Sequence, residues 1–178
     1  TMVPACVILT LAWTISGVCR DLLATGDYVA GVVAASNMPV MLIPAIMFGV
    51  SAMLSFATGT SWGTFGILIP IIVSVCETAA PELTVTALSA ILVGSVFGDH
   101  CSPISDTTIM SSTGAGCAHI DHVSTQLPYS LTVASVCVVG YLVAGFSAGL
   151  GFGTSLLITD VISLLLLAVL LLAMAIPS

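Results

Sequence analysis

The sequence predicts an all-α, polytopic membrane protein with discontinuous or re-entrant helices. The first observation is composition: 58% of the 178 residues are hydrophobic, 5% are charged, and the mean hydropathy is +1.26. Soluble domains are about one quarter charged, so a single Arg and eight acidic residues cannot cover an exterior that faces water. We therefore expect a lipid exterior and treat residues 1–178 as a single transmembrane domain, a reading that disfavours a soluble, very apolar enzyme domain.

The lengths of the apolar runs are the second observation. Residues 2–18 are about long enough to cross a bilayer, whereas residues 28–35 are too short. The run at 38–76 would measure about 58 Å as one helix, roughly twice the hydrocarbon thickness. This run must therefore break or turn back, and we expect it to do so at its polar interruption, residues 58–64.

A second polar interruption, residues 98–106, separates the apolar runs 84–97 and 107–117. Together these two runs suit one discontinuous span of about 37 Å. The rest of the chain is expected to form a polar loop followed by two closing spans, at 114–123, 126–150 and 153–176. The sequence thus predicts about five or six embedded helical segments and no β-sheet.

The segment 98–108 carries the strongest functional signal. Pro103 excludes a continuous helix through it. Six of its side chains bear oxygen atoms: Asp99, Ser102, Ser105, Asp106, Thr107 and Thr108. A hard cation such as Na⁺ takes several oxygen ligands, and carboxylates inside a membrane are costly enough to indicate function. The alternative is that Asp106 only caps a helix that begins at Thr107, and the two roles are compatible.

The segment 58–64 is the second candidate. Its hydroxyl-bearing residues and glycines are Thr58, Gly59, Thr60, Ser61, Gly63 and Thr64. The alternative interpretation is a close helix crossing of small residues. Because backbone groups without helical partners are tolerated in a membrane only around a shared cavity, we expect both interruptions to lie close together, near the middle of the membrane.

These two segments resemble the paired signatures of the NhaC-type sodium/proton antiporters. The residues concerned are Gly98-Asp-His-Cys-Ser-Pro-Ile-Ser-Asp-Thr-Thr108 and Thr58-Gly-Thr-Ser-Trp-Gly-Thr64. Shorter stretches at 11–14, 18–22, 119–123 and 126–129 are similar to the same family. The resemblance runs in order over about residues 5–150.

The resemblance implies one repeat of an inverted-repeat secondary transporter in the ion-transporter superfamily, corresponding to its carboxy-terminal half. It implies a multi-pass protein of the prokaryotic cytoplasmic membrane that is not an enzyme. Na⁺ would be exchanged for H⁺ by alternating access, with Asp99 and Asp106 carrying the ion and the proton. No cofactor is expected beyond these transported ions. The expected partners are the lipid bilayer and either an absent amino-terminal repeat or a second copy, with a homodimer as one option and no nucleic acid.

Two alternatives stay open at this point. Some relatives of the resembled family exchange malate and lactate with Na⁺ and H⁺, so sodium-coupled carboxylate exchange is the first. In that case helix N-termini and residues 58–64 would hold the anion. The second is a non-transporting structural membrane subunit, whose polar breaks only pack against partners.

Overall fold

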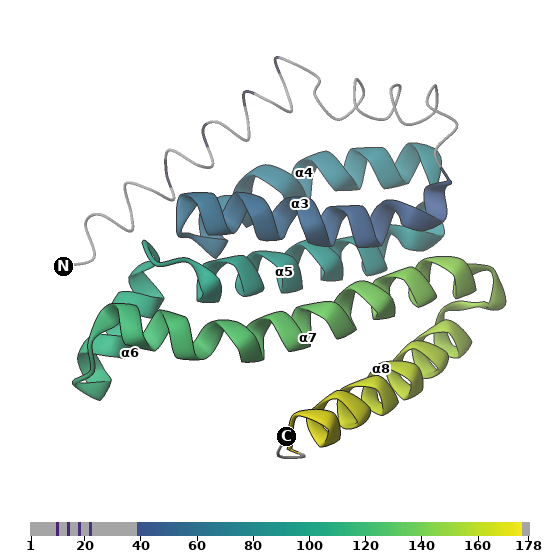
Figure 1. The fold of residues 1–178 in the computed structure, drawn as a ribbon. Helices are drawn as coiled ribbons and strands as arrows, with labels where there is room; N and C mark the ends of the chain where they lie inside the picture. The colour runs from purple at the N-terminus through teal and green to yellow at the C-terminus, as the bar shows by residue number, and fades with distance from the viewer. Residues whose placement is uncertain (1–9, 11–13, 15–17, 19–21, 23–38, 176–178) are drawn as a thin grey trace.

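A computed structural model describes residues 39–175 together with Thr10, Thr14, Val18 and Leu22. Apart from those four positions, the segments predicted at 2–18 and 28–35 lie outside the described residues. Residues 39–175 form six α-helices connected by short turns, and no strand occurs in the described residues (Figure 1). The helices are α3 (Ile43–Thr58), α4 (Ser61–Ala79), α5 (Thr84–Cys101), α6 (Asp106–Ala115), α7 (His119–Ser147) and α8 (Phe152–Ala175). Three short 3₁₀ turns accompany them: η2 (Val40–Leu42), η3 (Pro81–Leu83) and η4 (Ala148–Leu150).

Four helical stretches are long and apolar enough to cross a membrane: Val40–Thr58, Pro81–Cys101, His119–Leu150 and Phe152–Met174. A fifth apolar helix, Ser61–Glu77, is shorter. The chain is therefore an all-helical, multi-pass membrane protein, which confirms the fold class predicted from composition.

Helices α3 and α5 form the closest pair, and α4 packs against them while α8 lies at the opposite edge, against α7 (Figure 1). Two glycines of α5 allow the close approach to α3. A Cβ atom added at Gly94 would collide with Ser51 and the carbonyl of Phe48, and one added at Gly98 would collide with the carbonyl of Ala52. Small residues spaced in this way are typical of helix pairs in membranes, where packing replaces the hydrophobic effect.

Both predicted interruptions are present and shorter than expected. Only Gly59 and Thr60 separate α3 from α4, because residues 61–64 already form the first turn of α4. Only residues 102–105 separate α5 from α6, because α5 continues through Cys101. Gly98 lies in this extension, where its backbone packs closely on α3.

The prediction of a polar loop at 114–123 was wrong. Helix α6 continues to Ala115, α7 begins at His119, and only 116–118 connect them. Gly116 ends α6 in the left-handed conformation, with φ of 67°. Polar residues had indicated a loop, but Asp121 lies in the first turn of α7, where a carboxylate is favoured by the helix dipole. The two closing spans are confirmed as α7 and α8, with α7 starting earlier than predicted.

Candidate ion-binding site

The break between α3 and α4 depends on two residues. Gly59 ends α3 with φ of 67°, a left-handed conformation that favours glycine. Thr60 is extended, and its hydroxyl accepts a hydrogen bond from the backbone N–H of Gly63 at 3.4 Å. Thr60 is therefore the N-cap of α4, and Ser61 is the first residue of that helix.

The break between α5 and α6 follows from Pro103. Ser102 is extended, with φ of −75° and ψ of 125°, as expected for a residue that precedes proline. Ser105 is the N-cap of α6, and its hydroxyl accepts from the N–H of Thr107 at 3.2 Å. The capping role considered for Asp106 therefore belongs to Ser105, and Asp106 is the first residue of α6.

Asp99 connects the two breaks. Its side chain is only 4% exposed. One carboxylate oxygen, Oδ1, accepts from the hydroxyl of Ser105 at 2.7 Å, and Oδ2 accepts from the hydroxyl of Ser61 at 3.2 Å. The hydroxyl of Ser102 donates to the carbonyl of Phe56 near the end of α3 at 2.8 Å. The predicted proximity of the two breaks is confirmed, and their depth in a membrane stays a prediction.

The two breaks also touch through their backbones. A Cβ atom at Gly59 would lie 3.0 Å from the carbonyl oxygen of Ile104. Four helix ends therefore meet around Asp99: the C-termini of α3 and α5 and the N-termini of α4 and α6. Carbonyls at helix C-termini and N–H groups at helix N-termini lack helical partners, so this region offers groups for both cations and anions.

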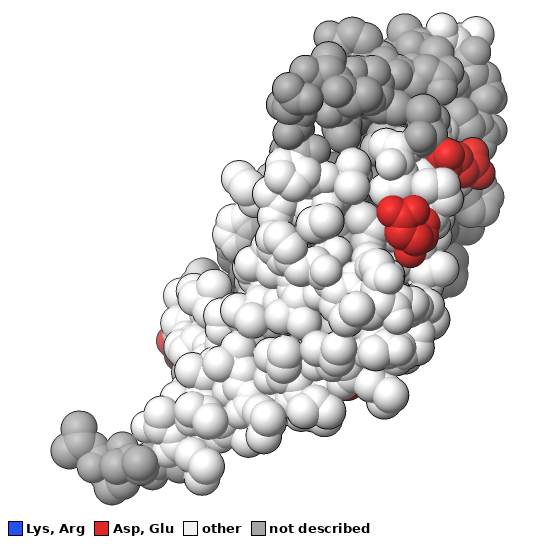
Figure 2. Space-filling view, turned by 90° about the vertical axis from the view of Figure 1, so that its right-hand side faces the viewer, with Lys and Arg blue, Asp and Glu red and all other residues white. Residues whose placement is uncertain are grey.

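No basic side chain in the described part of the chain can pair with Asp99. The single Arg of the sequence, Arg20, lies outside the described residues. On the face shown in Figure 2 the described surface is mostly white, with acidic patches and no blue one. The ring of His100 lies 2.8 Å from the carbonyl of Val96 in its own helix. Asp99 is therefore a buried carboxyl group without Lys or Arg beside it in the described residues, and its polar contacts there are the two hydroxyls.

The other predicted site residues divide into a buried and an exposed set. Thr64 and Thr108 are buried, and their hydroxyls donate to the carbonyls of Thr60 at 3.0 Å and His100 at 3.4 Å. Asp106, Thr107 and Thr58 are exposed. The hydroxyl of Thr107 lies 2.7 Å from that of Ser105, and Thr58 donates to the carbonyl of Leu54 at 2.8 Å. The structure thus groups Asp99 with Ser61 and Ser105, while Asp106 faces outward.

Comparison with known proteins identifies the family. Residues 1–146 match the family model described as "Na+/H+ antiporter family". The chain belongs to this family. The resemblance inferred from the two motifs is confirmed. No solved structure matches the chain.

Three curated relatives illustrate the family. The chain is 52% identical over 147 residues to an uncharacterized protein of Haemophilus influenzae. The aligned region covers 83% of this chain and 28% of that protein. It is 34% identical over 100 residues to the malate-2H⁺/Na⁺-lactate antiporter of Bacillus subtilis, covering 56% of this chain and 21% of the relative. It is 38% identical over 101 residues to an uncharacterized Na⁺/H⁺ antiporter of Haemophilus influenzae, and this match covers 54% of this chain and 21% of the relative. The chain therefore matches less than a third of the length of each of these relatives.

Sequence reasoning missed two sets of residues that support the site. The first set, Ser55 and Ser95, lies at the contact between α3 and α5. Ser55 donates to the carbonyl of Ser95 at 2.7 Å, and the hydroxyl of Ser95 is buried without a hydrogen-bond partner. Ser95 precedes Asp99 by four residues, so both lie on one face of α5. That spacing was the signal that could have identified Ser95.

The second missed group is His119, at the start of α7. Its Nε2 lies 2.7 Å from the carbonyl oxygen of Pro103, and its Nδ1 lies 3.2 Å from the hydroxyl of Ser112. Because a carbonyl can only accept, Nε2 carries the proton that it donates to Pro103. His119 therefore holds the break between α5 and α6 against α7. No local sequence pattern predicts this contact, which depends on the fold.

Proposed function

We propose that this chain supplies the carboxylate-bearing part of a secondary antiporter that exchanges Na⁺ for H⁺ across a prokaryotic cytoplasmic membrane. The observation that carries the proposal is the environment of Asp99. Its side chain is buried and accepts hydrogen bonds from hydroxyl groups at both helix breaks, and no Lys or Arg in the described residues can pair with it. A carboxylate in this setting takes either a proton or a cation.

The competition between the two ions follows from the donor and acceptor inventory. A protonated Asp99 is neutral and is compatible with the hydroxyls of Ser61 and Ser105 as hydrogen-bond partners. When Na⁺ replaces the proton, those hydroxyls rotate, and their oxygen lone pairs join the carboxylate as ligands. Because one carboxylate cannot hold both ions at once, release of one is coupled to uptake of the other. The backbone carbonyls at the ends of α3 and α5 are further candidate ligands.

Asp106 has a different part in the proposal. It is exposed at the N-terminus of α6, next to the Ser105 cap that bonds Asp99. We assign Asp106 to the route by which ions reach Asp99, as a second carboxylate that carries the ion or proton. The rest of the ion shell would come from other parts of the polypeptide or from a second copy of this chain. No chemical catalysis is part of the proposal.

Sodium-coupled exchange of a carboxylate is the second candidate. The malate-2H⁺/Na⁺-lactate antiporter among the relatives supports it, as do the two helix N-termini beside Asp99, because N-terminal N–H groups bind anions. In this version Asp99 still carries the cation, and the N-termini of α4 and α6 hold the organic anion.

The test is a Na⁺ pulse to acid-loaded vesicles that contain the protein as its gene encodes it, with internal pH read by a fluorescent dye. Wild-type vesicles should alkalinise on addition of Na⁺ when it drives H⁺ in the opposite direction, and Asp99→Asn should abolish this signal. Asp121→Asn is the matched control, because it removes an exposed carboxylate from the first turn of α7. Exchange that requires added malate would favour the second candidate. Wild-type exchange by Asp99→Asn would reject Asp99 as the ion-carrying residue in both candidates, and an absence of exchange in wild-type vesicles would favour a structural subunit.

A further inference from the structure

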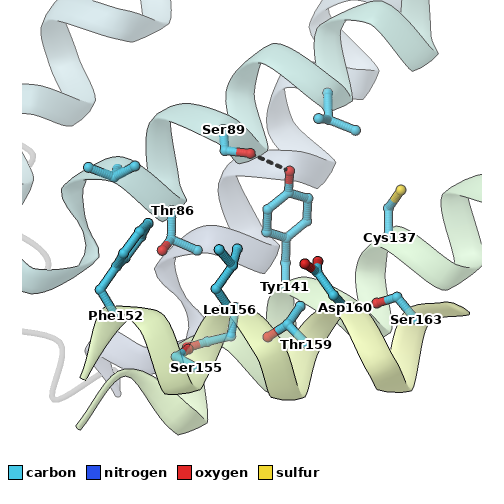
Figure 3. Close-up of a pocket in the computed structure, with 14 residues that line it drawn as sticks. Thr86, Ser89, Cys137, Tyr141, Phe152, Ser155, Leu156, Thr159, Asp160 and Ser163 are labelled. Carbon is cyan, nitrogen blue, oxygen red and sulfur yellow. Dashed lines mark hydrogen bonds between the residues drawn. The ribbon is translucent and has the colours of Figure 1, made fainter. Parts of the chain in front are cut away.

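A second candidate site, partly open and lined mainly by apolar atoms, lies between α5, α7 and α8, away from the helix breaks. It is a cavity of about 320 Å³, and none of its lining residues belongs to the two motif segments (Figure 3). Its polar lining includes Ser89, Tyr141, Ser155, Thr159, Ser163 and Asp160. Helix α8 follows residue 146, where the match to the antiporter family ends, so the family assignment makes no statement about this wall.

Asp160 is an acidic residue within an apolar helix. It is the only acidic residue in α8, which is the most apolar of the four candidate spans. Asp160 lies about 12 Å along α8 from Phe152, which places it inside the hydrocarbon if the helix crosses the membrane. Its side chain is exposed in this chain, and Figure 3 shows its carboxylate on the cavity side of α8, beside Tyr141. A carboxylate at such a position indicates a binding function, because its cost in a membrane is high.

The hydrogen bonds around the cavity indicate which chemical groups a ligand beside Asp160 would need. Two pairs of hydroxyls bond each other, Ser89 with Tyr141 at 3.0 Å and Ser147 with Ser155 at 2.7 Å. The hydroxyl oxygen of Thr159 is buried and has no partner. An ionised carboxylate can only accept hydrogen bonds, and the hydroxyls still have free lone pairs. The complementary ligand therefore carries a positive charge and several N–H or O–H donors.

The size of the cavity selects among cations. A bare metal ion needs several oxygen atoms in direct contact, whereas about 320 Å³ is the size of a small-molecule pocket. Apolar side chains such as Val93, Phe152 and Leu156 complete the walls. We infer that this cavity binds a small organic ammonium ion, with its charged nitrogen on Asp160 and Thr159 and its short apolar chain against these walls. The proposal is independent of ion exchange at Asp99.

Cys137 allows a direct test because its thiol lines the same cavity. The protein is placed in nanodiscs of phosphatidylglycerol, which has no amine, and the rate of alkylation of Cys137 by N-ethylmaleimide is followed by peptide mass spectrometry. n-Butylammonium should slow this reaction in a saturable manner. Asp160→Asn should weaken the apparent affinity for butylammonium about tenfold or more, the scale expected for loss of a hydrogen bond to a charged group. This measurement requires no transport, so it stands or falls separately from the exchange assay.

Control measurements distinguish the proposal from its alternatives. Asp121→Asn, which removes a carboxylate outside the cavity, should keep wild-type protection, and thermal unfolding should establish that both variants are folded. Equal protection by n-butanol, equal protection by Na⁺, or unchanged protection in Asp160→Asn would each overturn the proposal. A parallel arm with phosphatidylethanolamine identifies the source of the amine. If that lipid alone protects Cys137 and butylammonium adds nothing, the bound ammonium is a lipid headgroup rather than a soluble amine.

Discussion

The two helix breaks contribute unequally to one site. The break between α3 and α4 is two residues long, and Ser61, the first residue of α4 after it, donates its hydroxyl to Asp99 at 3.2 Å. The break between α5 and α6 is four residues long, follows Asp99 closely, and contributes the hydroxyl of Ser105 at 2.7 Å. The second break is also held to α7 through His119 and to α3 through Ser102. Under the proposed function, this difference predicts that the second break binds the ion and that the first supports it.

The largest expected effect is on the rate of exchange, and it differs between Asp99 and Asp106, the two carboxylates that flank the second break. Asp99→Asn should reduce Na⁺-dependent exchange by more than about 100-fold, beyond the 10–100-fold that loss of a group supporting a metal ligand costs. Asp106→Asn should reduce it by about tenfold or less, because the two hydroxyls beside the breaks bond Asp99, whereas Asp106 is exposed in this chain and is assigned to the entry route. Initial rates of Na⁺-driven pH change in vesicles give both values. A larger loss for Asp106→Asn would transfer the main ion-binding role to Asp106.

The next effect compares the hydroxyls that the two breaks donate to Asp99. Ser105→Ala removes the shorter hydrogen bond and also the N-cap of α6, so the KM for Na⁺ should rise about tenfold. Ser61→Ala removes only a longer hydrogen bond, and a rise of about threefold is expected. Rates measured over a range of Na⁺ concentrations distinguish these outcomes. If Ser61→Ala had the larger effect, the first break would be the principal ligand-bearing segment.

The sequence predicted the parts of this structure that depend on local patterns. Run lengths predicted the two closing spans, but residues 84–97 and 107–117 were expected to share one discontinuous span, whereas Pro81–Cys101 is long enough to cross by itself. Pro103 and Gly59 predicted the two breaks. The choice between Asp99 and Asp106 was beyond local patterns, because it depends on α5 continuing through Cys101 and turning Asp99 toward Ser61. The contact of His119 with Pro103 joins residues 16 apart through the turn after α6, so it required the fold. Asp160 was not singled out because α8 was interpreted only as an apolar span.

The smallest expected effect tests the contact between the breaks. Gly59 and Gly116 end α3 and α6 with the same backbone angles, φ of 67° and ψ of 26°. Alanine at either position should therefore cost about 1–2 kcal/mol of conformational strain. They differ in surroundings: a Cβ at Gly59 would lie 3.0 Å from both the Cγ1 and the carbonyl oxygen of Ile104, whereas no atom lies within 4 Å of one at Gly116.

Gly59→Ala should therefore destabilise the protein by about 1 kcal/mol more than Gly116→Ala, the lower end of the cost of overpacking. For a chain of this size that difference lowers the unfolding midpoint by about 2–4 °C, measurable by circular dichroism in detergent. Because the added methyl group pushes on the carbonyl of Ile104, Gly59→Ala should also raise the KM for Na⁺, which Gly116→Ala should leave unchanged. Equal midpoints and equal KM values for the two variants would mean that the first break does not position the second, and the support role assigned to it would be wrong.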